Sequence, residues 1–245
     1  MKVTRYGEFY GYIAEGYFQS EEEIKKSPRQ MRELAPGDIK YKDLNDDGVI
    51  DANDQCYLGK SWFPSWSYGM GFNINYHNFD LALFFQGVSD VSIMANGGSI
   101  DTGNGDWGAS GVGIVPFTGM GLNPSNVITK ALDRWTADNP RADAWYPRMT
   151  ANATTNDNNY VNSTHWLKDG SYLRLKQASL GYTLENKKLM DKGIEYLYFY
   201  LSGQNLLTFS KFKLWDPELG SNGAKYPLSR MVTLGMRVSF NLIKQ

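Results

Sequence analysis

The chain has 245 residues, a formal net charge of −1 and 14% aromatic residues. The near-neutral charge gives no indication of a nucleic-acid surface, and no run approaches the roughly 18 apolar residues that predict a transmembrane helix. Aromatic and glycine enrichment with ordinary hydrophobicity is typical of all-β proteins, including membrane barrels. The lone cysteine, Cys56, excludes an internal disulfide and has no catalytic neighbourhood.

The N-terminal quarter contains one strand-like run and a long polar excursion. Residues 3–18 are aromatic and interrupted by glycines, which predicts a strand of uncertain facing. The polar excursion of residues 19–63 opens with a short predicted helix, because Ser20 and Glu23 match a capping box. An Asp-rich loop follows at residues 43–54.

The clearest strands alternate apolar with small or polar residues, which only a β-strand places on opposite faces. A bulge near Lys176 and Gln177 would reconcile a phase slip inside one of them. In the last strand, a charge-free apolar file faces one way and Arg237 the other, as expected with lipid outside and a watery lumen inside. The predicted strands are residues 66–76, 79–86, 172–182, 196–207 and 231–242.

The connections between these strands alternate in length. Residues 77–78 and 185–194 are short, whereas residues 19–65, 92–170 and 209–227 are long, and a short helix is predicted over residues 125–137. Transmembrane barrels have this asymmetry, with short periplasmic turns and long extracellular loops. Aromatic residues of the apolar file next to the short connections predict an interfacial girdle; these are Tyr76, Phe79, Tyr182 and Phe240.

The fold class predicted from these features is all-β. About six antiparallel up-and-down strands would form the C-terminal segment of a large transmembrane β-barrel, with long extracellular loops carrying short helices. Six strands are too few to close a barrel, which needs about eight. The start of the chain also has no signal-peptide core. We therefore expect residues 1–245 to be a single partial domain, with the remaining strands and any plug domain supplied by a longer chain.

Several stretches, in this order, closely resemble the C-terminal region of SusC/RagA-type TonB-dependent outer-membrane transporters. Together they cover nearly the whole chain. They are Gly37-Asp38-Ile39-Lys40-Tyr41 with the Asp-rich loop, Phe79-Asp80-Leu81 through Phe85-Gln86-Gly87, Ala131-Leu132-Asp133-Arg134-Trp135-Thr136, Gly170-Ser171-Tyr172-Leu173-Arg174-Leu175-Lys176, Leu201-Ser202-Gly203-Gln204-Asn205-Leu206 and Tyr226-Pro227-Leu228-Ser229-Arg230.

The resemblance implies part of an importer of oligosaccharides or peptides in the cell outer membrane of a Bacteroidetes-type Gram-negative bacterium. It implies a SusD-like lipoprotein partner, contact with lipid, and energy from a TonB complex acting through an N-terminal part that this chain lacks. One departure is that Phe240, which corresponds to the family's terminal Phe, is followed by five more residues.

The Asp-rich loop fits the template of a calcium-binding loop. Oxygen-bearing side chains fall at the ligand positions and Gly48 falls at the sharp turn, although the last position is Asp rather than the longer Glu. A structural Ca²⁺ would pin an extracellular loop; the alternative is a solvated turn without metal. The predicted ligands are Asp43, Asn45, Asp47, Val49 through its carbonyl, Asp51 and Asp54.

Other candidate residues are polar or aromatic groups without a catalytic pattern. The sequence has no zinc spacing, nucleophile elbow or P-loop, so an enzyme is not expected. Lumen-facing or plug-facing residues would be Asp80, Tyr196, Tyr198, Tyr200 and Arg237, the tyrosines contacting either plug or cargo. Loop residues Trp107, Trp145 and Trp166 are candidates for substrate or lid contact.

The alternative function is that of a secreted, calcium-stabilised β-domain that binds carbohydrate through exposed aromatic residues. The two hypotheses differ in the apolar files. A soluble domain would bury them in one core, whereas a barrel would expose them to lipid.

Overall fold

The computed structural model describes residues 6–96, 129–149, 157–221, 223, 226 and 228–241. Contacts divide the chain into two compact units. We call residues 65–89, 171–211 and 227–245 the sheet unit, and residues 1–64, 90–170 and 212–226 the loop unit. The expectation of one partial domain over residues 1–245 stays a prediction.

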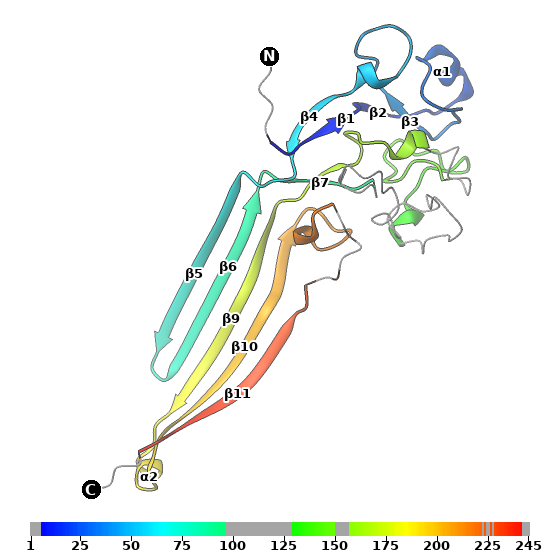
Figure 1. Ribbon diagram of the computed structural model, residues 1–245. Helices are drawn as coiled ribbons and strands as arrows, with labels where there is room; N and C mark the ends of the chain where they lie inside the picture. Colours follow the sequence, from blue (N-terminus) through cyan, green and yellow to red (C-terminus); the bar gives the residue numbers. More distant parts are fainter. Residues whose placement is uncertain are drawn as a thin grey trace. The chain divides into compact units, whose positions relative to one another are not determined.

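The sheet unit is one antiparallel sheet of five long strands in the order β11-β10-β9-β6-β5 (Figure 1). Its strands are β5 (Trp66–Tyr76), β6 (Phe79–Ser89), β9 (Tyr172–Leu184), β10 (Ile194–Ser210) and β11 (Met231–Phe240). Short connections join neighbouring strands at one end: His77 and Asn78, with His77 at φ 51°, and a turn containing helix α2 (Lys187–Met190). The up-and-down plan predicted from alternation is confirmed, with β11 pairing with β10.

A double irregularity crosses the middle of the sheet. Gln177 pairs with Phe84 but Leu175 pairs with Phe85, so Lys176 is the extra residue of a bulge in β9. On the other side of β9, the register with β10 shifts between Gln204 and Leu207, where Asn205 adopts φ 52°. The bulge predicted near Lys176 and Gln177 is therefore confirmed, and it keeps Leu173 and Leu175 on the same face as Leu180.

Within its described residues, the loop unit contains three small two-stranded sheets. β1 (Glu8–Gly11) pairs with β4 (Cys56–Ser61), β2 (Ala14–Tyr17) with β3 (Ile39–Tyr41), and β7 (Ser92–Met94) with β8 (Leu167–Asp169). The strand-like run of residues 3–18 is thus β1 and β2, not a sixth strand of the large sheet. Its aromatic side chains are the physical reason, because Phe9, Tyr12 and Tyr17 are buried in the core of this unit.

Short helical turns also occur in the described part of the loop unit. They are α1 (Glu21–Lys26) and the 3₁₀ turns η1 (Ala52–Asp54), η2 (Thr129–Leu132), η4 (Asp157–Tyr160) and η5 (Pro217–Leu219). Where an α-helix is expected over residues 125–137, the described part begins with η2 and continues as irregular backbone. Trp135 donates its backbone N–H to Tyr146 rather than within a helix. Among the described residues no helix is both long enough and apolar enough to cross a membrane.

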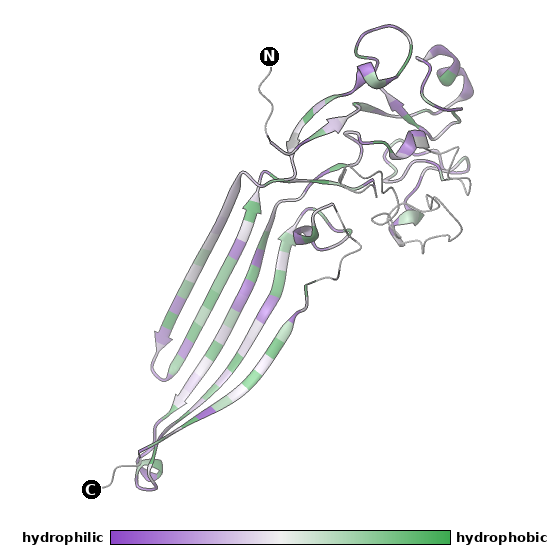
Figure 2. Ribbon diagram, in the orientation of Figure 1, coloured by the Kyte–Doolittle hydropathy of each residue, from purple (hydrophilic) through white to green (hydrophobic). Residues whose placement is uncertain are grey.

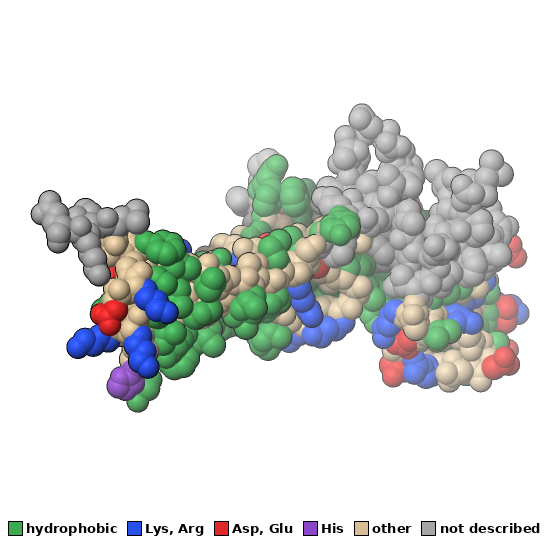
Figure 3. Space-filling view, turned by 90° about the horizontal axis from the view of Figure 1, so that it is seen from below, with side chains coloured by type: hydrophobic (Ala, Val, Ile, Leu, Met, Phe, Trp, Pro, Cys, Tyr) green, Lys and Arg blue, Asp and Glu red, His purple; other side chains and the backbone are tan. Residues whose placement is uncertain are grey.

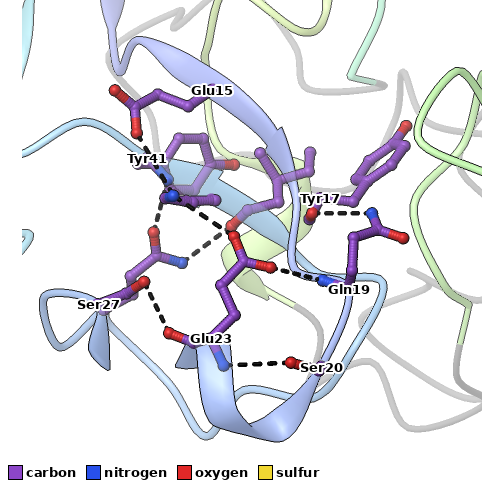
Figure 4. A network of polar contacts seen from close by, with 10 residues as sticks. Glu15, Tyr17, Gln19, Ser20, Glu23, Ser27 and Tyr41 are labelled. Atoms are coloured by element: carbon purple, nitrogen blue, oxygen red, sulfur yellow. Dashed lines mark hydrogen bonds and ion pairs between the residues drawn. The ribbon is translucent and has the colours of Figure 1, made fainter. Parts of the chain in front are cut away.

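Helix α1 begins after Ser20, as predicted, but only the Ser20 half of the predicted capping box forms (Figure 4). The Ser20 hydroxyl accepts the Glu23 backbone N–H at 3.2 Å. The Glu23 carboxylate accepts the N–H of Gln19, one residue before the cap, and lies 3.4 Å from Lys40 Nζ. The helix is therefore capped at its start and tied to β3 by an ion pair that is worth little by itself at a partly exposed site.

A buried polar network replaces extended sheet structure around β3. The Asn159 side chain accepts the Ile39 N–H at 2.8 Å and donates to Asp38 Oδ1 at 2.8 Å. Asn158 Nδ2 donates to the Ile39 carbonyl, and the Tyr41 hydroxyl donates to the Asn158 carbonyl at 2.6 Å. These two asparagines are fully buried, and their amides satisfy backbone groups of β3 that have no neighbouring strand.

Candidate functional site

One face of the five-stranded sheet is apolar on every strand. Register places Phe72 opposite Leu83, Leu81 opposite Leu180, Leu180 opposite Leu201, and Leu201 opposite Leu234. The hydropathy of successive residues alternates along the strands in Figure 2, and Figure 3 shows hydrophobic side chains gathered over the sheet. The face contains Met70, Phe72, Ile74, Leu81, Leu83, Phe85, Leu173, Leu175, Leu180, Leu197, Phe199, Leu201, Val232, Leu234, Met236 and Val238.

Nine of the sixteen side chains of this apolar face are exposed, and the other seven are partly buried. Leu234 is 80% exposed, Val232 67%, Met236 59% and Ile74 55%. Contiguous apolar surface on this scale is rare on soluble monomers and marks contact with a membrane or another apolar surface. An antiparallel strand with one charge-free face and one mixed face is the pattern of a transmembrane barrel wall.

Aromatic residues cluster on the apolar face beside the short β5–β6 turn. Tyr76 pairs with Phe79, Phe79 pairs with Tyr182, and the last two rings lie 4.7 Å apart. Phe240 lies at the end of β11 next to the turn that contains α2. The structure brings together three of the four residues of the predicted girdle.

The opposite face carries the five predicted lumen-facing residues. Tyr198 pairs with Arg237, whose guanidinium carbon lies 5.8 Å from the ring centroid. The Tyr198 hydroxyl donates to Asp80 Oδ2 at 2.9 Å. Tyr196 and Tyr200 share this face by strand alternation, and the rings of Tyr198 and Tyr200 stack at 5.9 Å. The structure therefore places all five residues on one face of the sheet. That this face contacts a lumen or a plug stays a prediction.

Two glycines that sequence reasoning did not single out make this arrangement possible. A Cβ atom on Gly181 would lie 2.2 Å from the Tyr198 hydroxyl and 2.4 Å from an Asp80 oxygen. A Cβ atom on Gly235 would lie 2.3 Å from the Tyr200 ring. Each tyrosine thus lies over a glycine of a neighbouring strand. The available signal is a glycine at a polar-face position of a long strand, where backbone entropy otherwise disfavours it.

The three tryptophans predicted for substrate or lid contact have different positions. Trp166 is 0% exposed, so its contact role is not supported and it is a core residue. Its indole N–H donates to the Asn159 carbonyl at 2.7 Å, and its ring lies 5.5 Å from both Trp145 and Tyr160. Trp145 is partly buried, with Lys168 Nζ 5.2 Å from its ring. Trp107 lies outside the described residues.

The Asp-rich loop is ordered by its own carboxylates. Asp43 accepts the N–H groups of Asp46 and Gly48, and Asp47 accepts that of Val49. Gly48 has φ 82°, as the predicted sharp turn requires. Ile50 is buried in the core and donates its N–H to the Arg29 carbonyl, which anchors the loop.

Asp54, the last residue of the calcium template, closes the loop. Its side chain is fully buried and accepts the N–H groups of Leu44 and Asp51 at 2.7 and 2.8 Å. Burial acts to raise the pKa of Asp54, but the backbone hydrogen bonds outweigh it and lower that pKa below its usual value. Within the described ranges no three or more His, Cys, Asp or Glu side chains are grouped to hold a metal ion. Calcium binding therefore stays a prediction.

Comparisons with known proteins agree with this geometry, although no family model matches the sequence. TonB-dependent receptor P26 of Formosa agariphila is 30% identical over 241 residues, covering 92% of this chain and 22% of the receptor. TonB-dependent receptor P3 of the same organism is 28% identical over 250 residues, covering 96% and 22%.

Solved structures show the same fold. The RagAB peptide importer in its open-open state matches 98% of this chain and 24% of that chain, with a TM-score of 0.63 and 22% identity. A second RagAB peptide transporter structure matches 95% and 22%, with a TM-score of 0.61 and 24% identity. The chain therefore spans about a fifth to a quarter of the length of these relatives.

The exposed apolar face, the up-and-down topology and these matches define a segment of an outer-membrane-type β-barrel of the TonB-dependent receptor class. Within that class the chain is SusC/RagA-like. The relatives are named as receptors and importers, not as enzymes, in agreement with the absence of a catalytic pattern.

Proposed function

We propose that the chain forms part of the barrel wall and of the extracellular loops of an outer-membrane importer in a Bacteroidetes-type bacterium. The apolar face of the sheet unit contacts lipid, and the face carrying Asp80, Tyr198 and Arg237 contacts the lumen or plug. The loop unit works with a SusD-like lipoprotein on the extracellular side, and the cargo is an oligosaccharide or peptide. A TonB complex supplies energy through the plug-bearing part of the longer protein.

The observation that carries this proposal is the exposure of the apolar face. Folding of a water-soluble domain is driven by burial of such side chains, at about 25 cal/mol for each Å² of apolar area. Leaving Leu234, Val232 and Met236 more than half exposed forgoes that stabilisation. Contact with lipid removes the cost, because hydrocarbon tails solvate these side chains. This exposure counts against the soluble carbohydrate-binding domain.

Fluorescent labelling tests the assignment of the two faces. In a Cys56→Ser background, a label is attached to Leu234→Cys or to its neighbour Thr233→Cys, which faces the opposite way. In proteoliposomes, lipids with brominated tails should quench the label at position 234 strongly, while aqueous iodide should quench it weakly. The label at position 233 should show the reverse order. Equal quenching by the lipid-embedded quencher at both positions would contradict the proposal.

We also propose that the Asp-rich loop binds Ca²⁺ weakly. The ligand types and the turn at Gly48 support binding, whereas the carboxylates of Asp47, Asp51 and Asp54 already accept backbone N–H groups. Because metal binding has to compete with these bonds, the expected Kd is in the roughly 10⁻⁴–10⁻³ M range of extracellular calcium modules.

Calcium should therefore slow amide exchange of Gly48 and Val49 only at millimolar concentration in native-state hydrogen exchange. The Asp43→Ala and Asp47→Ala double variant should lose this response, and magnesium should not reproduce it. A response of the same size in the double variant, or no response of the native protein at 10-fold excess over about 1 mM, would show that the loop is a metal-free turn.

A further inference from the structure

His165 lies at a junction of three segments of the loop unit. Its ring meets Trp166 edge-to-face at 4.7 Å and Tyr17 of β2 at 5.5 Å. Its Nε2 atom lies 3.2 Å from the Trp145 carbonyl oxygen and 3.4 Å from the Tyr17 hydroxyl. The imidazole thus connects β2 to the segment of residues 144–146.

The hydrogen bonds around this ring specify its tautomer. The Tyr17 hydroxyl donates its proton to the Ala144 carbonyl at 2.8 Å, so it does not donate to the imidazole. A carbonyl oxygen can only accept, so the Nε2 atom that approaches the Trp145 carbonyl must bear a hydrogen. The neutral ring therefore carries its proton on Nε2, and Nδ1 is the atom that protonates in acid.

The surroundings oppose a positive charge on this ring. Burial, followed by the charge of Lys168, lowers the pKa of His165 to about 4, and the hydrogen bond to the Trp145 carbonyl offsets only part of this. Burial also raises the pKa of Tyr17, which stays a neutral hydroxyl. The carboxylate of Asp133, whose field reaches Tyr17, is held in ion pairs with Lys130 and Arg141.

We propose that His165 and Tyr17 form an acid-sensitive latch that holds the 144–146 segment on β2, and that protonation of His165 Nδ1 releases this segment. A released His165 regains its ordinary pKa of about 6.5 and binds a proton that the closed latch excludes. The closed state is therefore fully favoured above pH 6.5, and its stability relative to the released state decreases as the pH falls toward 4. This inference concerns the loop unit alone and does not depend on the proposed transport function.

Native-state hydrogen exchange of the membrane-inserted protein tests the latch. The reporters are the amides of Tyr146 and Trp135, which donate to Asp133 and Tyr146 carbonyls. Their protection factors, corrected for the intrinsic pH dependence of exchange, should fall roughly 50-fold between pH 7.0 and 4.5, as linkage for these two pKa values requires. His165→Gln keeps an N–H donor but cannot become charged, so its protection factors should fall far less.

The other histidine provides a matched control. His77 lies in the β5–β6 turn, and His77→Gln should retain the full fall of the native protein. Nitrogen-15 NMR of labelled histidine should show His165 protonated at Nε2 and titrating below pH 5. Titration of His165 near pH 6.5, or the same fall in protection in His165→Gln as in the native protein, would overturn the latch.

Discussion

Replacing Trp166 with alanine is expected to destabilise the loop unit by about 3–5 kcal/mol, the range for truncating a buried aromatic side chain. Trp166 has no exposed surface and contacts the rings of Trp145, Tyr146, Tyr160 and His165. Truncation opens a cavity among these rings. It also removes the indole N–H that donates to the buried Asn159 carbonyl. The same asparagine accepts the Ile39 N–H of β3 through its side chain, so the effect should extend to β3.

The free energy of local opening, measured by hydrogen exchange of the Ile39 and Tyr146 amides, reports this loss. Trp166→Phe keeps most of the ring volume but removes the N–H donor, so it should cost about 1–3 kcal/mol and separate packing from hydrogen bonding. Leu132→Ala is the control, because Leu132 is 76% exposed and its truncation should cost less than about 0.5 kcal/mol. Equal effects of Trp166→Ala and Leu132→Ala would show that the aromatic cluster does not stabilise this unit.

Replacing Leu234 with arginine is expected to destabilise the membrane-inserted protein by about 2–4 kcal/mol, because the charge then lies in hydrocarbon near the middle of a strand. Leu234 occupies the fourth position of the ten-residue strand β11. Its side chain makes few contacts within the chain, at 80% exposure, so the same change in a water-soluble protein should be almost neutral.

Urea unfolding in lipid vesicles measures this difference, with Thr233→Arg as the control. Thr233 is the preceding residue, and it pairs with Ser202 on the polar face. An arginine there should change stability by less than about 1 kcal/mol. A cost for Leu234→Arg no larger than that for Thr233→Arg would exclude lipid contact at this face.

The five long strands could be predicted from the sequence because strict alternation specifies a strand and its facing residues together. Residues 66–76 match β5 at both ends, and the phase slip at Lys176 correctly indicated a bulge. In these strands one face must be uniformly apolar, so the pattern is strong. The polar-face set of Asp80, Tyr198 and Arg237 followed from the same alternation.

The loop unit was less predictable because its stability depends on contacts between residues far apart in the sequence. β1 pairs with β4, some 45 positions later, and neither strand alternates clearly. The side chains of Asn158 and Asn159 form hydrogen bonds with backbone groups of β3, which lies more than 110 residues earlier in the sequence. From the sequence alone, a pair of asparagines in a polar stretch indicates only a turn. Trp166, between His165 and Leu167 in a polar stretch, likewise gives no sign of complete burial.

The bond between Tyr198 and Asp80 has a consequence for strand register. It joins β10 to β6 over the intervening β9, a span of about two strand spacings or 10 Å. A slip of β9 by two residues would preserve which face is apolar, so alternation alone does not prevent it. Such a slip would bring Ser179 or Thr183 under the tyrosine, where a Cβ atom would displace the Tyr198 hydroxyl and the Asp80 carboxylate and so break their hydrogen bond. Gly181 thus favours the one alignment of the three strands in which the Tyr198–Asp80 hydrogen bond can form, among several that the hydrophobic pattern permits.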